Sequence, residues 1–479
     1  METITLTANK QQIINAAQAW HYSIIPKEAG EHWSFYIDEE KYSADVKEEL
    51  EVLFDRIVHL TRVDSGQIYQ ALNIYYRKKN GGDIGNSAGN IELSGKSDKD
   101  FLNKLIEEAF DLEASDIHIE IYDKNARVRF RIDGKLIEKY ILPKRDYPAI
   151  TNKVKIKANM DIAEKRLPQD GRIFFKSETK SFDIRVSSLP SLHGEKIVLR
   201  LLRKDTSRFD LDRIGFSERQ KKDYFQSLKR TKGIMLISGP TGSGKTTTLY
   251  ATLKRLNTKE TNILTIEDPI EYTLEGVNQV QLKESIGLTF AEALRTFLRQ
   301  DPDIIMLGEI RDAATAQMAI RAALTGHLVL STVHTNSAWG SIARLKDMGI
   351  PEFLLADTVN VSVAQRLVRS LCPKCKRKIQ SAQASGDMLI LHHIYEYYEP
   401  VGCDYCYYTG YRGRTAIFEI IPVTPSLAKK MRKSDMDVTA YLKENGISTL
   451  AESALGLVKS GQTSQEEIYP ILLNEQNYG

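Results

Sequence analysis

The stretch 233-GIMLISGPTGSGKTTTLYATLKRL-256 changes its pattern twice. Its first residues, 233-GIMLISG-239, are apolar and partly β-branched, which is typical of a buried strand, and 246-TTTLYATLKRL-256 is typical of a helix. Between them, 239-GPTGSGKT-246 matches G-x-x-x-x-G-K-[ST], whose glycines let backbone N–H groups surround phosphate oxygens. Because the strand and the helix that this motif requires are both present, a chance match is disfavoured. The stretch therefore predicts a phosphate-binding loop in an α/β domain.

The side chains of this loop have expected roles in binding ATP and Mg²⁺. Lys245 is expected to reach the outer phosphates, and Thr246 to offer its hydroxyl to the metal. The candidate nucleotide-binding residues of the loop and the turn after it are Gly239, Pro240, Thr241, Gly242, Ser243, Gly244, Lys245, Thr246 and Thr247.

A second apolar stretch, 301-DPDIIMLGEIRD-312, ends in an acid. Most P-loop enzymes hold Mg²⁺ with an Asp on such a strand, but here Gly308 stands beside Glu309, and Asp303 lies at the beginning. We expect this strand to lie beside the strand 233–239, with Glu309 at the carboxyl end that faces the ligand. Glu309 is thus the candidate to orient or deprotonate an attacking water.

An acidic box, 265-TIEDPIEY-272, follows another predicted strand. Its acids Glu267, Asp268 and Glu271 can supply the metal-side charge that Gly308 does not. Taken alone, the box is also compatible with an acidic surface loop. Next to a phosphate loop the functional interpretation is favoured, with Glu267 and Glu271 as candidate catalytic acids.

The strands 262–268, 304–309 and 328–334 alternate with helical stretches such as 289–300, which predicts an open α/β sheet. Upstream, a helix at 101–114 precedes a predicted hairpin at 115–136. In that hairpin Ile117, Ile119 and Ile121 alternate with polar residues, so one wet face is expected. Strands expected at 172–177, 181–190 and 196–202 complete an α+β domain.

The N-terminal region shows one clear periodicity. Val46, Leu50, Leu53, Ile57 and Leu60 recur with helical spacing, which predicts a helix over 44–60. The segment 78–100 is rich in Gly, Ser, Asn and Asp, as flexible linkers are.

All four cysteines stand in two pairs, 372-CPKC-375 and 403-CDYC-406, separated by 27 residues. Two such pairs can close a tetrahedral zinc site with Zn–S distances of about 2.3 Å. Four unrelated thiols are the alternative, disfavoured because the chain has no other cysteine. The spacing predicts a structural zinc ion bound by Cys372, Cys375, Cys403 and Cys406.

Length and charge limit the classes of function. The chain has 479 residues, about three domains' worth, and its 66 basic and 63 acidic side chains leave a net charge of +3. This balance gives no whole-chain argument for nucleic acid. No apolar run approaches the ~18 residues of a spanning helix, and METITLTANKQQIINAAQAW lacks the features of a secretory signal. The chain is expected in the cytosol.

Several of these stretches together resemble one family. GPTGSGKTTTLY, TIEDPIEY, RQDPDIIMLGEIRD and TGHLVLSTVHTN are similar to the phosphate loop, acidic box, second nucleotide strand and histidine box of the secretion-ATPase superfamily. That family powers type II secretion and type IV pilus assembly. ASDIHIE, RVRFRIDG and RLPQDGRI extend the resemblance to about residues 101–421. The family's second nucleotide strand ends in Gly-Glu, as here, so the missing Asp is the family's own pattern.

The resemblance implies a RecA-like P-loop ATPase domain with a doubly wound sheet, behind a smaller α+β PAS-like domain, with a small four-cysteine zinc insertion. It also implies a homohexamer with ATP between the two domains, a polytopic inner-membrane platform protein as partner, and a cytoplasmic chain peripherally associated with that membrane. The expected regions are an N-terminal partner-binding region at 1–77, the linker at 78–100, the PAS-like domain at 101–208, and the ATPase domain at 209–479 with the zinc element at 367–415 and a helical tail at 422–479.

Other polar residues receive roles from the resemblance. In 325-TGHLVLSTVHTN-336, His334 at the carboxyl end of the strand is the implied sensor of the phosphate state, and His327 positions the strand. Arg172 and Arg185 match positions that face nucleotide in the family, where a guanidinium can stabilise the transferring phosphoryl group. Further candidates are Arg311 and the pair Arg295 and Arg299, which are expected to share a helix face.

Within the family, an extension-type pilus assembly ATPase is the leading hypothesis. Retraction ATPases lack the tetracysteine element, and the short N-terminal region favours a pilus system over type II secretion, which stays open as the alternative. A RecA-like nucleic-acid motor is the alternative from another class. Its main support is 405-YCYYTGYRGR-414, which combines aromatic and basic side chains, and nucleic acid is not the expected partner.

Overall fold

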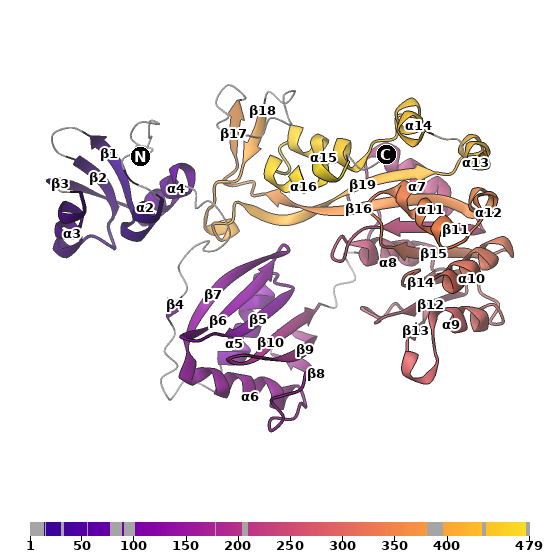
Figure 1. The fold of residues 1–479 in the computed structure, drawn as a ribbon, viewed down its shortest axis with the longest axis horizontal. Coiled ribbons are helices and arrows are strands. Elements are labelled where there is room, and N and C mark those ends of the chain that lie inside the picture. Colours follow the sequence, from indigo (N-terminus) through magenta and orange to yellow (C-terminus); the bar gives the residue numbers. More distant parts are fainter. Residues whose placement is uncertain are drawn as a thin grey trace. The chain divides into compact units, whose positions relative to one another are not determined.

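The computed structural model describes residues 14, 16–29, 33–54, 56–76, 89–90, 101–177, 179–203, 209–380, 396–433 and 437–475. The chain divides into two compact units. One is drawn from residues 1–173, 185–200 and 371–412, and the other from residues 174–184, 201–370 and 413–479. Figure 1 shows their helices and strands. Among the described residues, none of the helices combines the length and the hydrophobicity needed to cross a membrane.

The N-terminal region is a small α+β layer. Strand β1 (Ile24–Ala29) pairs antiparallel with β2 (Trp33–Asp38), which pairs parallel with β3 (Val58–Val63). Helices α2 (Ala16–Tyr22), α3 (Ala44–Phe54) and α4 (Ser65–Tyr75) accompany the sheet. Their shared core contains Ile25, Phe35, Leu50, Ile68 and Leu72.

The predicted helix over 44–60 is correct only for its first part. Helix α3 ends at Phe54, and the residues from Val58 onward form β3. The apolar period continued by coincidence into a segment whose β-branched residues pair with β2, which overrides helical spacing. Leu53 and Ile57, expected on the buried face, are 45% and 55% exposed.

The α+β domain is built on a seven-stranded sheet. Its strand order is β4-β7-β6-β5-β10-β9-β8. The hairpin of β5 (Asp116–Ile121) and β6 (Asn125–Ile132) is antiparallel, as predicted. The remaining elements are α5 (Phe101–Asp111), β7 (Lys135–Pro143), α6 (Tyr147–Lys157), β8 (Gln169–Lys176), β9 (Ser181–Ser191) and β10 (Gly194–Leu202). The predicted linker 78–100 lies outside the described residues except for β4 (Gly89–Asn90), which pairs with β7.

The expectation of one wet face on this hairpin is wrong for β5, whose residues are all buried. Glu120 contacts Arg127 at 3.0 Å, Arg129 at 2.7 Å and Lys196 at 3.1 Å. Burial raises the pKa of Glu120, but the hydrogen bonds from Arg129, Lys196 and Arg127 outweigh it and lower the pKa to about 2. Long basic side chains thus cover the face that alternation alone assigned to solvent.

The largest set of parallel strands forms the sheet β13-β12-β14-β15-β11-β16-β19. Pairing is parallel from β13 through to β16. The strands are β11 (Gly233–Ser238), β12 (Ile263–Glu267), β13 (Asn278–Gln281), β14 (Ile304–Leu307), β15 (Leu328–Val333), β16 (Val359–Leu371) and β19 (Tyr411–Pro422).

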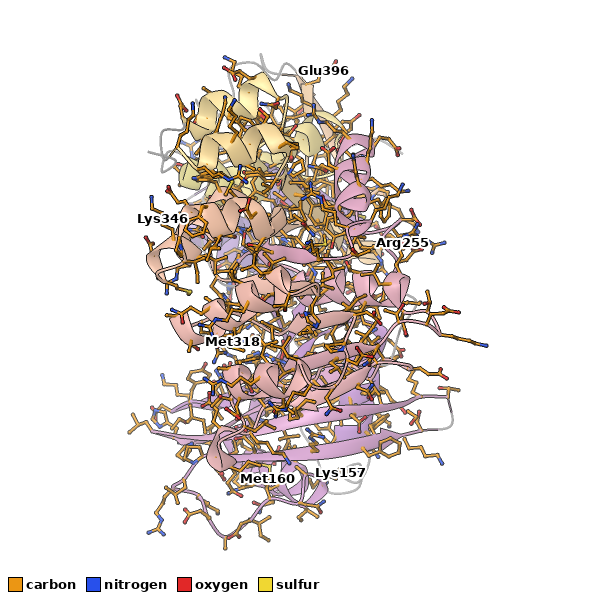
Figure 2. All side chains as sticks on the ribbon, turned by 90° about the vertical axis from the view of Figure 1, so that its right-hand side faces the viewer. Lys157, Met160, Arg255, Met318, Lys346 and Glu396 are labelled. Atoms are coloured by element: carbon orange, nitrogen blue, oxygen red, sulfur yellow. The ribbon has the colours of Figure 1, made fainter. Side chains whose placement is uncertain are left out.

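Helices alternate with these strands along the chain, as an α/β sheet requires. They are α7 (Glu218–Leu228), α8 (Lys245–Leu256), α9 (Phe290–Phe297), α10 (Ala313–Leu324), α11 (Ala338–Asp347) and α12 (Glu352–Thr358). Their outer faces carry charged side chains such as Arg255 of α8 and Lys346 of α11 (Figure 2). The predicted helical tail is present as α13 (Pro425–Met431), α14 (Val438–Glu444), α15 (Leu450–Lys459) and α16 (Gln465–Glu475).

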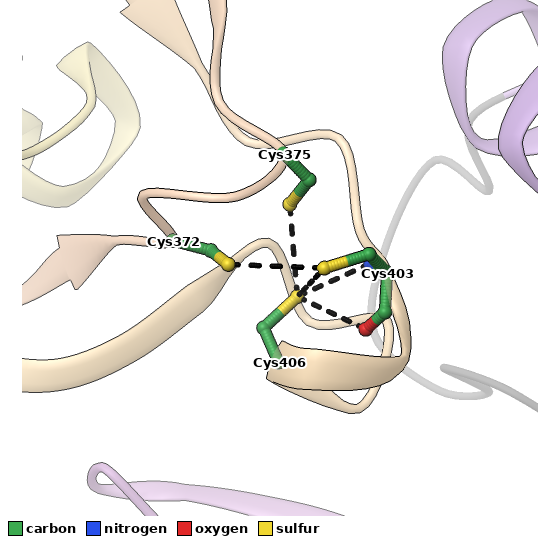
Figure 3. A group of neighbouring side chains, drawn as sticks. All are labelled: Cys372, Cys375, Cys403 and Cys406. Carbon is green, nitrogen blue, oxygen red and sulfur yellow. Dashed lines mark hydrogen bonds between the residues drawn. The ribbon is translucent and has the colours of Figure 1, made fainter.

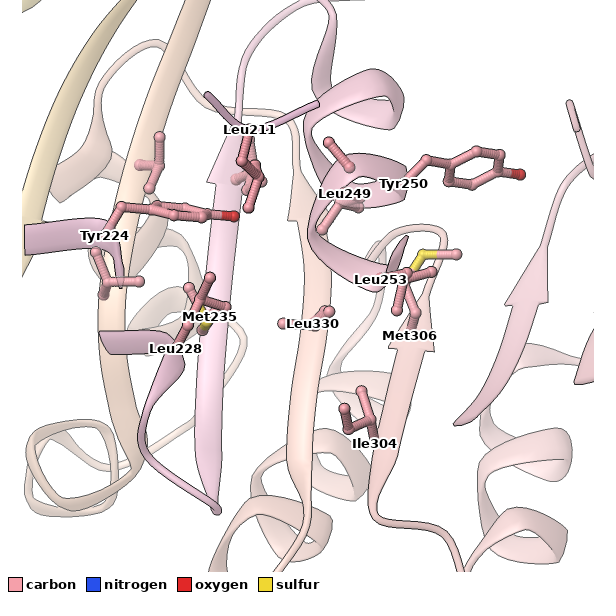
Figure 4. Packing of buried hydrophobic residues seen from close by; sticks show 14 of the residues in the cluster. Leu211, Tyr224, Leu228, Met235, Leu249, Tyr250, Leu253, Ile304, Met306 and Leu330 are labelled. Carbon is pink, nitrogen blue, oxygen red and sulfur yellow. The ribbon is translucent and has the colours of Figure 1, made fainter. Parts of the chain in front are cut away.

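One prediction about strand order is wrong. Strand β14, which precedes Glu309, does not lie beside β11, because β15 pairs with both of them. Figure 4 shows the three strands through Met235, Leu330 and Met306. These side chains belong to the core that α7 and α8 cover, where each buried aliphatic side chain contributes about 1.5–3 kcal/mol.

Candidate active site and metal centre

The loop 239–246 joins the carboxyl end of β11 to the first turn of α8. Gly239, Gly242 and Gly244 have φ values of 150°, 80° and 89°, a region that L side chains rarely adopt. A Cβ on Gly239 would also lie 2.5 Å from the Gln365 carbonyl oxygen, and a Cβ on Gly244 would lie 2.7 Å from the Gln365 Nε2. Gly239 and Gly244 are therefore fixed by both conformation and space, and Gly242 by conformation alone.

Lys245 points back into this loop. Its Nζ donates to the carbonyl oxygens of Gly239 at 2.7 Å and Pro240 at 3.1 Å. Burial lowers the pKa of Lys245, while the nearby Glu309 acts to raise it. The Ser243 hydroxyl is buried and has no hydrogen-bond partner among the described atoms. The loop thus holds a buried cation and an unsatisfied hydroxyl, groups that an anion's oxygens would satisfy.

Glu309 lies in a charged cluster at the carboxyl ends of β12, β14 and β15. Its Oε1 accepts a hydrogen bond from Arg311, and its Oε2 is 3.2 Å from His334 Nε2. Arg311 is also 3.9 Å from Asp268 of the acidic box. Burial raises the pKa of Glu309, but Arg311, His334 and Lys245 together hold it below its usual value. Glu309 is therefore a carboxylate at neutral pH.

Gly308, the residue that replaces an Asp, has a packing reason. Its N–H donates to the Ile266 carbonyl oxygen at 2.8 Å. A Cβ on Gly308 would lie only 3.3 Å from that oxygen and 3.4 Å from Glu267 Cα. The close approach of this segment to the end of β12 therefore favours glycine over a residue with a side chain.

The acidic box divides between core and surface. Glu267 is 4% exposed, and its oxygens accept hydrogen bonds from Tyr250, from Thr265 at 2.7 Å and from Gln279 at 3.0 Å. Glu271 is half-buried. Of the box, the structure brings Asp268 to the Glu309 cluster, through Arg311, whereas Glu267 is engaged by neighbouring hydroxyl and amide groups.

The two histidines lie at opposite ends of β15, as predicted. His327 Nδ1 is 3.0 Å from the Ala322 carbonyl oxygen and 3.2 Å from Thr325 Oγ1. His327 therefore belongs to the turn that begins the strand, and only His334 is brought to Glu309.

The candidate arginines lie in different settings. Arg295, on α9, pairs with Glu292 at 2.8 Å. Helix α9 ends at Phe297, so Arg299 lies beyond it, and the expectation that both share a helix face is wrong. Arg172 is exposed on β8 and Arg185 is half-buried on β9. Both belong to the unit that does not contain Glu309, and their contact with nucleotide stays a prediction.

Two polar residues of β16 were missed by the sequence reasoning. Gln365 is 2% exposed and accepts a hydrogen bond from Thr248 Oγ1 of α8 at 2.8 Å. Arg366 donates to the Gln365 carbonyl oxygen and to the Asn336 carbonyl oxygen, both at 2.9 Å. Their signal is a Gln-Arg pair inside 359-VNVSVAQRLV-368, a valine-rich run that also contains Asn360 and Ser362.

The four cysteines come together, as predicted, in one cluster (Figure 3). Their sulfur atoms all lie within 4.8 Å of one another. Cys372 and Cys403 are 3.8 Å apart, Cys375 and Cys406 3.7 Å, and Cys403 and Cys406 3.8 Å. A tetrahedron with metal–sulfur distances of about 2.3 Å has edges of about 3.8 Å, so the sulfurs fit such a site.

Backbone groups complete the cluster. The N–H groups of Gly402 and Gly410 donate to the sulfurs of Cys375 and Cys406, each at 3.3 Å. Such outer-shell hydrogen bonds orient metal ligands. Burial raises the pKa of the Cys375 and Cys406 thiols.

Comparison with known proteins shows the family. The sequence profile "Type II/IV secretion system protein" matches residues 94–470. The chain is 45% identical to the type II secretion system protein E of Dickeya dadantii, over 78% of this chain and 75% of that protein. It is 46% identical to the type IV pilus assembly ATPase PilB of Acinetobacter baylyi, over 77% of this chain and 65% of that protein.

Solved structures of ATPases also resemble this chain. The pilus retraction motor PilT with bound ADP matches with a TM-score of 0.52 and 26% identity, over 77% of this chain and 96% of that chain. The Legionella pneumophila ATPase DotB matches in fold, with a TM-score of 0.60 and 20% identity, over 81% and 98%. The chain belongs to the type II/IV secretion system protein family and is an ATP hydrolase of that family.

Proposed function

We propose that this ATPase is a homohexameric, Mg²⁺-dependent motor that drives pilin assembly. The observation that supports the hydrolytic part of the proposal is the meeting of Glu309, His334 and Arg311 on the same edge of the sheet as the Lys245 loop. In a parallel sheet, ligands bind at the carboxyl ends of the strands.

The loop 239–246 fits a nucleotide phosphate chain. Lys245 would exchange its two carbonyl partners for phosphate oxygens, and the buried Ser243 hydroxyl would gain a partner. The first N–H groups of α8 add donors, including those of Thr246 and Thr247. Bound Mg²⁺ supplies neutralisation of the phosphate charge, with the exposed Thr246 hydroxyl as its proposed ligand.

Glu309 is the proposed base. Its ionised carboxylate can orient the attacking water and accept a proton at an oxygen now held by Arg311 or His334. We assign metal-side charge to Asp268 and Glu271. Glu267, already engaged by three donors, has a supporting role at the end of β12.

Arginines would complete the site. We propose Arg172 and Arg185 as groups that stabilise the transferring phosphoryl charge when the smaller domain closes on the ATPase domain, and Arg295 and Arg299 as further nucleotide contacts. This proposal takes residues 209–479 as a RecA-like domain and 101–208 as a PAS-like domain. Residues 1–77 would bind the partner, and 78–100 would link the two parts.

The tetracysteine cluster is the proposed zinc site. Four thiolates leave no open position, so the ion would be structural. A metal assay of undenatured protein should find one zinc per chain, and substoichiometric zinc would count against the assignment.

The partner proposed for the motor is a polytopic platform protein of the inner membrane, with the chain on the cytoplasmic side. PilB and secretion protein E relatives are almost equally similar to this chain, at 46% and 45% identity. A deletion strain separates the two systems, since loss of pili with normal protein secretion supports the pilus, and the reverse result supports secretion.

The catalytic proposal is tested by Glu309→Gln. The amide keeps the size of the side chain but cannot act as a base, so turnover should fall by about 10²–10⁴-fold. Binding of ATP, measured by equilibrium titration, should persist. Turnover at the wild-type rate would move the base to the acidic box, with Glu271 and Glu267 the next to test.

A further inference from the structure

Arg366 connects two loops at the edge of the sheet where the catalytic groups gather. One donor, Nη1, binds the Gln365 carbonyl oxygen at 2.9 Å. The other, Nη2, binds the Asn336 carbonyl oxygen at 2.9 Å and Asn336 Oδ1 at 3.3 Å. The same guanidinium lies 3.1 Å from where a Gly239 Cβ would stand. Arg366 therefore passes between the beginning of the 239–246 loop and the segment after β15.

That segment, residues 334–337, begins with His334. Two residues further, Asn336 is held by Arg366, and the Ser337 carbonyl oxygen accepts hydrogen bonds from Ser238 at 3.2 Å and Thr335 at 3.1 Å. Ser238 ends β11 and Arg366 belongs to β16. The segment that carries His334 is thus hydrogen-bonded to β11, which leads into the phosphate loop, and to β16, which pairs with β11.

We propose that Arg366 is a positioning residue for ATP hydrolysis, which sets the 334–337 segment so that His334 meets Glu309. The proposal rests on the function proposed above for Glu309 and His334. A misplacement of about 1 Å can cost about 10²-fold in rate. The distance between His334 Nε2 and Glu309 Oε2 is 3.2 Å, so a shift of this size would break the contact. Arginine suits the task because its planar fork offers two donors in fixed directions, which a lysine does not.

Kinetics of single and double variants test the proposal. Arg366→Ala should lower kcat by about 10–100-fold while KM for ATP changes by less than about twofold, because the proposed role acts through the placement of His334 and not through phosphate binding. Arg366→Lys should recover part of kcat. In the His334→Ala background, Arg366→Ala should add less than about a twofold loss, because both changes break one arrangement.

Three results would overturn it. The first is a double variant in which the losses of kcat of the two single variants multiply. The second is an Arg366→Ala variant with a raised KM for ATP and an unchanged kcat. The third is a His334→Ala variant that keeps wild-type turnover. A matched control is Arg230→Ala. Arg230 makes the same kind of bridge, from Asn360 Oδ1 at 3.1 Å to the Val423 carbonyl oxygen at 3.1 Å, where β16 begins. Its kcat should stay within about twofold of wild type.

A readout independent of turnover separates this proposal from the catalytic one. With labelled histidine, the His334 imidazole signal, identified by its loss in His334→Ala, should shift in Arg366→Ala and stay in place in Arg230→Ala. If Glu309→Gln retained full turnover, the proposed base would be wrong, yet this signal would still decide whether Arg366 positions His334. An unmoved signal in Arg366→Ala would reject the positioning role.

Discussion

Glu120 in the α+β domain and Glu309 at the edge of the large sheet are both carboxylates held by arginine. Glu120 contacts two arginines and a lysine, and its side chain is 6% exposed. Glu309 contacts one arginine and one histidine at 14% exposure, and these partners are themselves 56% and 51% exposed. The partners of Glu309 can therefore be exchanged for water or substrate, whereas those of Glu120 are less exposed, at 30%, 22% and 38%, and there are three of them.

This contrast separates two uses of a charged group. A buried carboxylate surrounded by cations contributes to the stability of the fold, and removing it leaves uncompensated buried charge. A partly exposed carboxylate with exchangeable partners is available for chemistry. The sequence showed only half of this difference. It predicted Glu309 at the ligand-facing end of a strand, but it assigned Glu120 to a wet face that the structure shows to be covered by basic side chains.

The largest expected effect is that of removing the charge of Glu120 on the stability of the α+β domain. Glu120→Gln removes the ion pair of Arg129 at 2.7 Å and that of Arg127 at 3.0 Å, and leaves Arg127 with Glu138 at 3.5 Å. Because the two arginines are partly exposed, the α+β domain should lose about 3 kcal/mol, the lower end of the cost of breaking a buried pair. Hydrogen exchange of the β5 and β6 amides in the full chain measures this locally. Glu309→Gln should leave the same amides unaffected. Equal losses in both variants would erase the distinction between the two carboxylates.

Lowering the pH should gradually produce the same loss of stability in the α+β domain, because it protonates Glu120. The pKa of Glu120 is lowered to about 2 from the ordinary value of 4.5. Its contribution to stability is therefore fully present above about pH 4.5, and it declines as the pH falls through the folded-state pKa toward 2. Protection of the β5 and β6 amides should fall over this window. In Glu120→Gln that part of the pH dependence should vanish, and a slope unchanged by the substitution would contradict the assignment.

Sequence predicted most of the large sheet because each strand there is a short apolar run followed by a distinctive loop. The loop 239–246, Glu309 and the four cysteines were located from local pattern, and His334 was chosen by resemblance to the family. Strand order was not, since nothing in 301-DPDIIMLGEIRD-312 encodes that β15 would lie between β14 and β11. Such adjacency depends on crossovers between distant segments.

Long-range contacts also explain the other errors. The period that predicted a helix through Leu60 is a local signal, whereas β3 forms through pairing with β2. Arg366 was missed because its importance lies in contacts with Asn336 and the space beside Gly239. Glu267 was predicted to supply metal-side charge because the sequence does not show that Tyr250, on helix α8, donates a hydrogen bond to it.

The smallest expected effect concerns Arg311, the exposed arginine that binds Glu309. Arg311→Ala removes the strongest group that lowers the pKa of Glu309, so that pKa should rise. Since the base must be ionised, the acid limb of the kcat–pH profile should move to higher pH, with a loss of about tenfold or less near neutral pH. Arg311→Lys should restore much of the profile, because the positive charge returns. Arg255→Ala, on the exposed face of α8, is the matched control. An acid limb that stays in place would show that Arg311 does not set the charge of Glu309, and the two carboxylates would then differ only in burial.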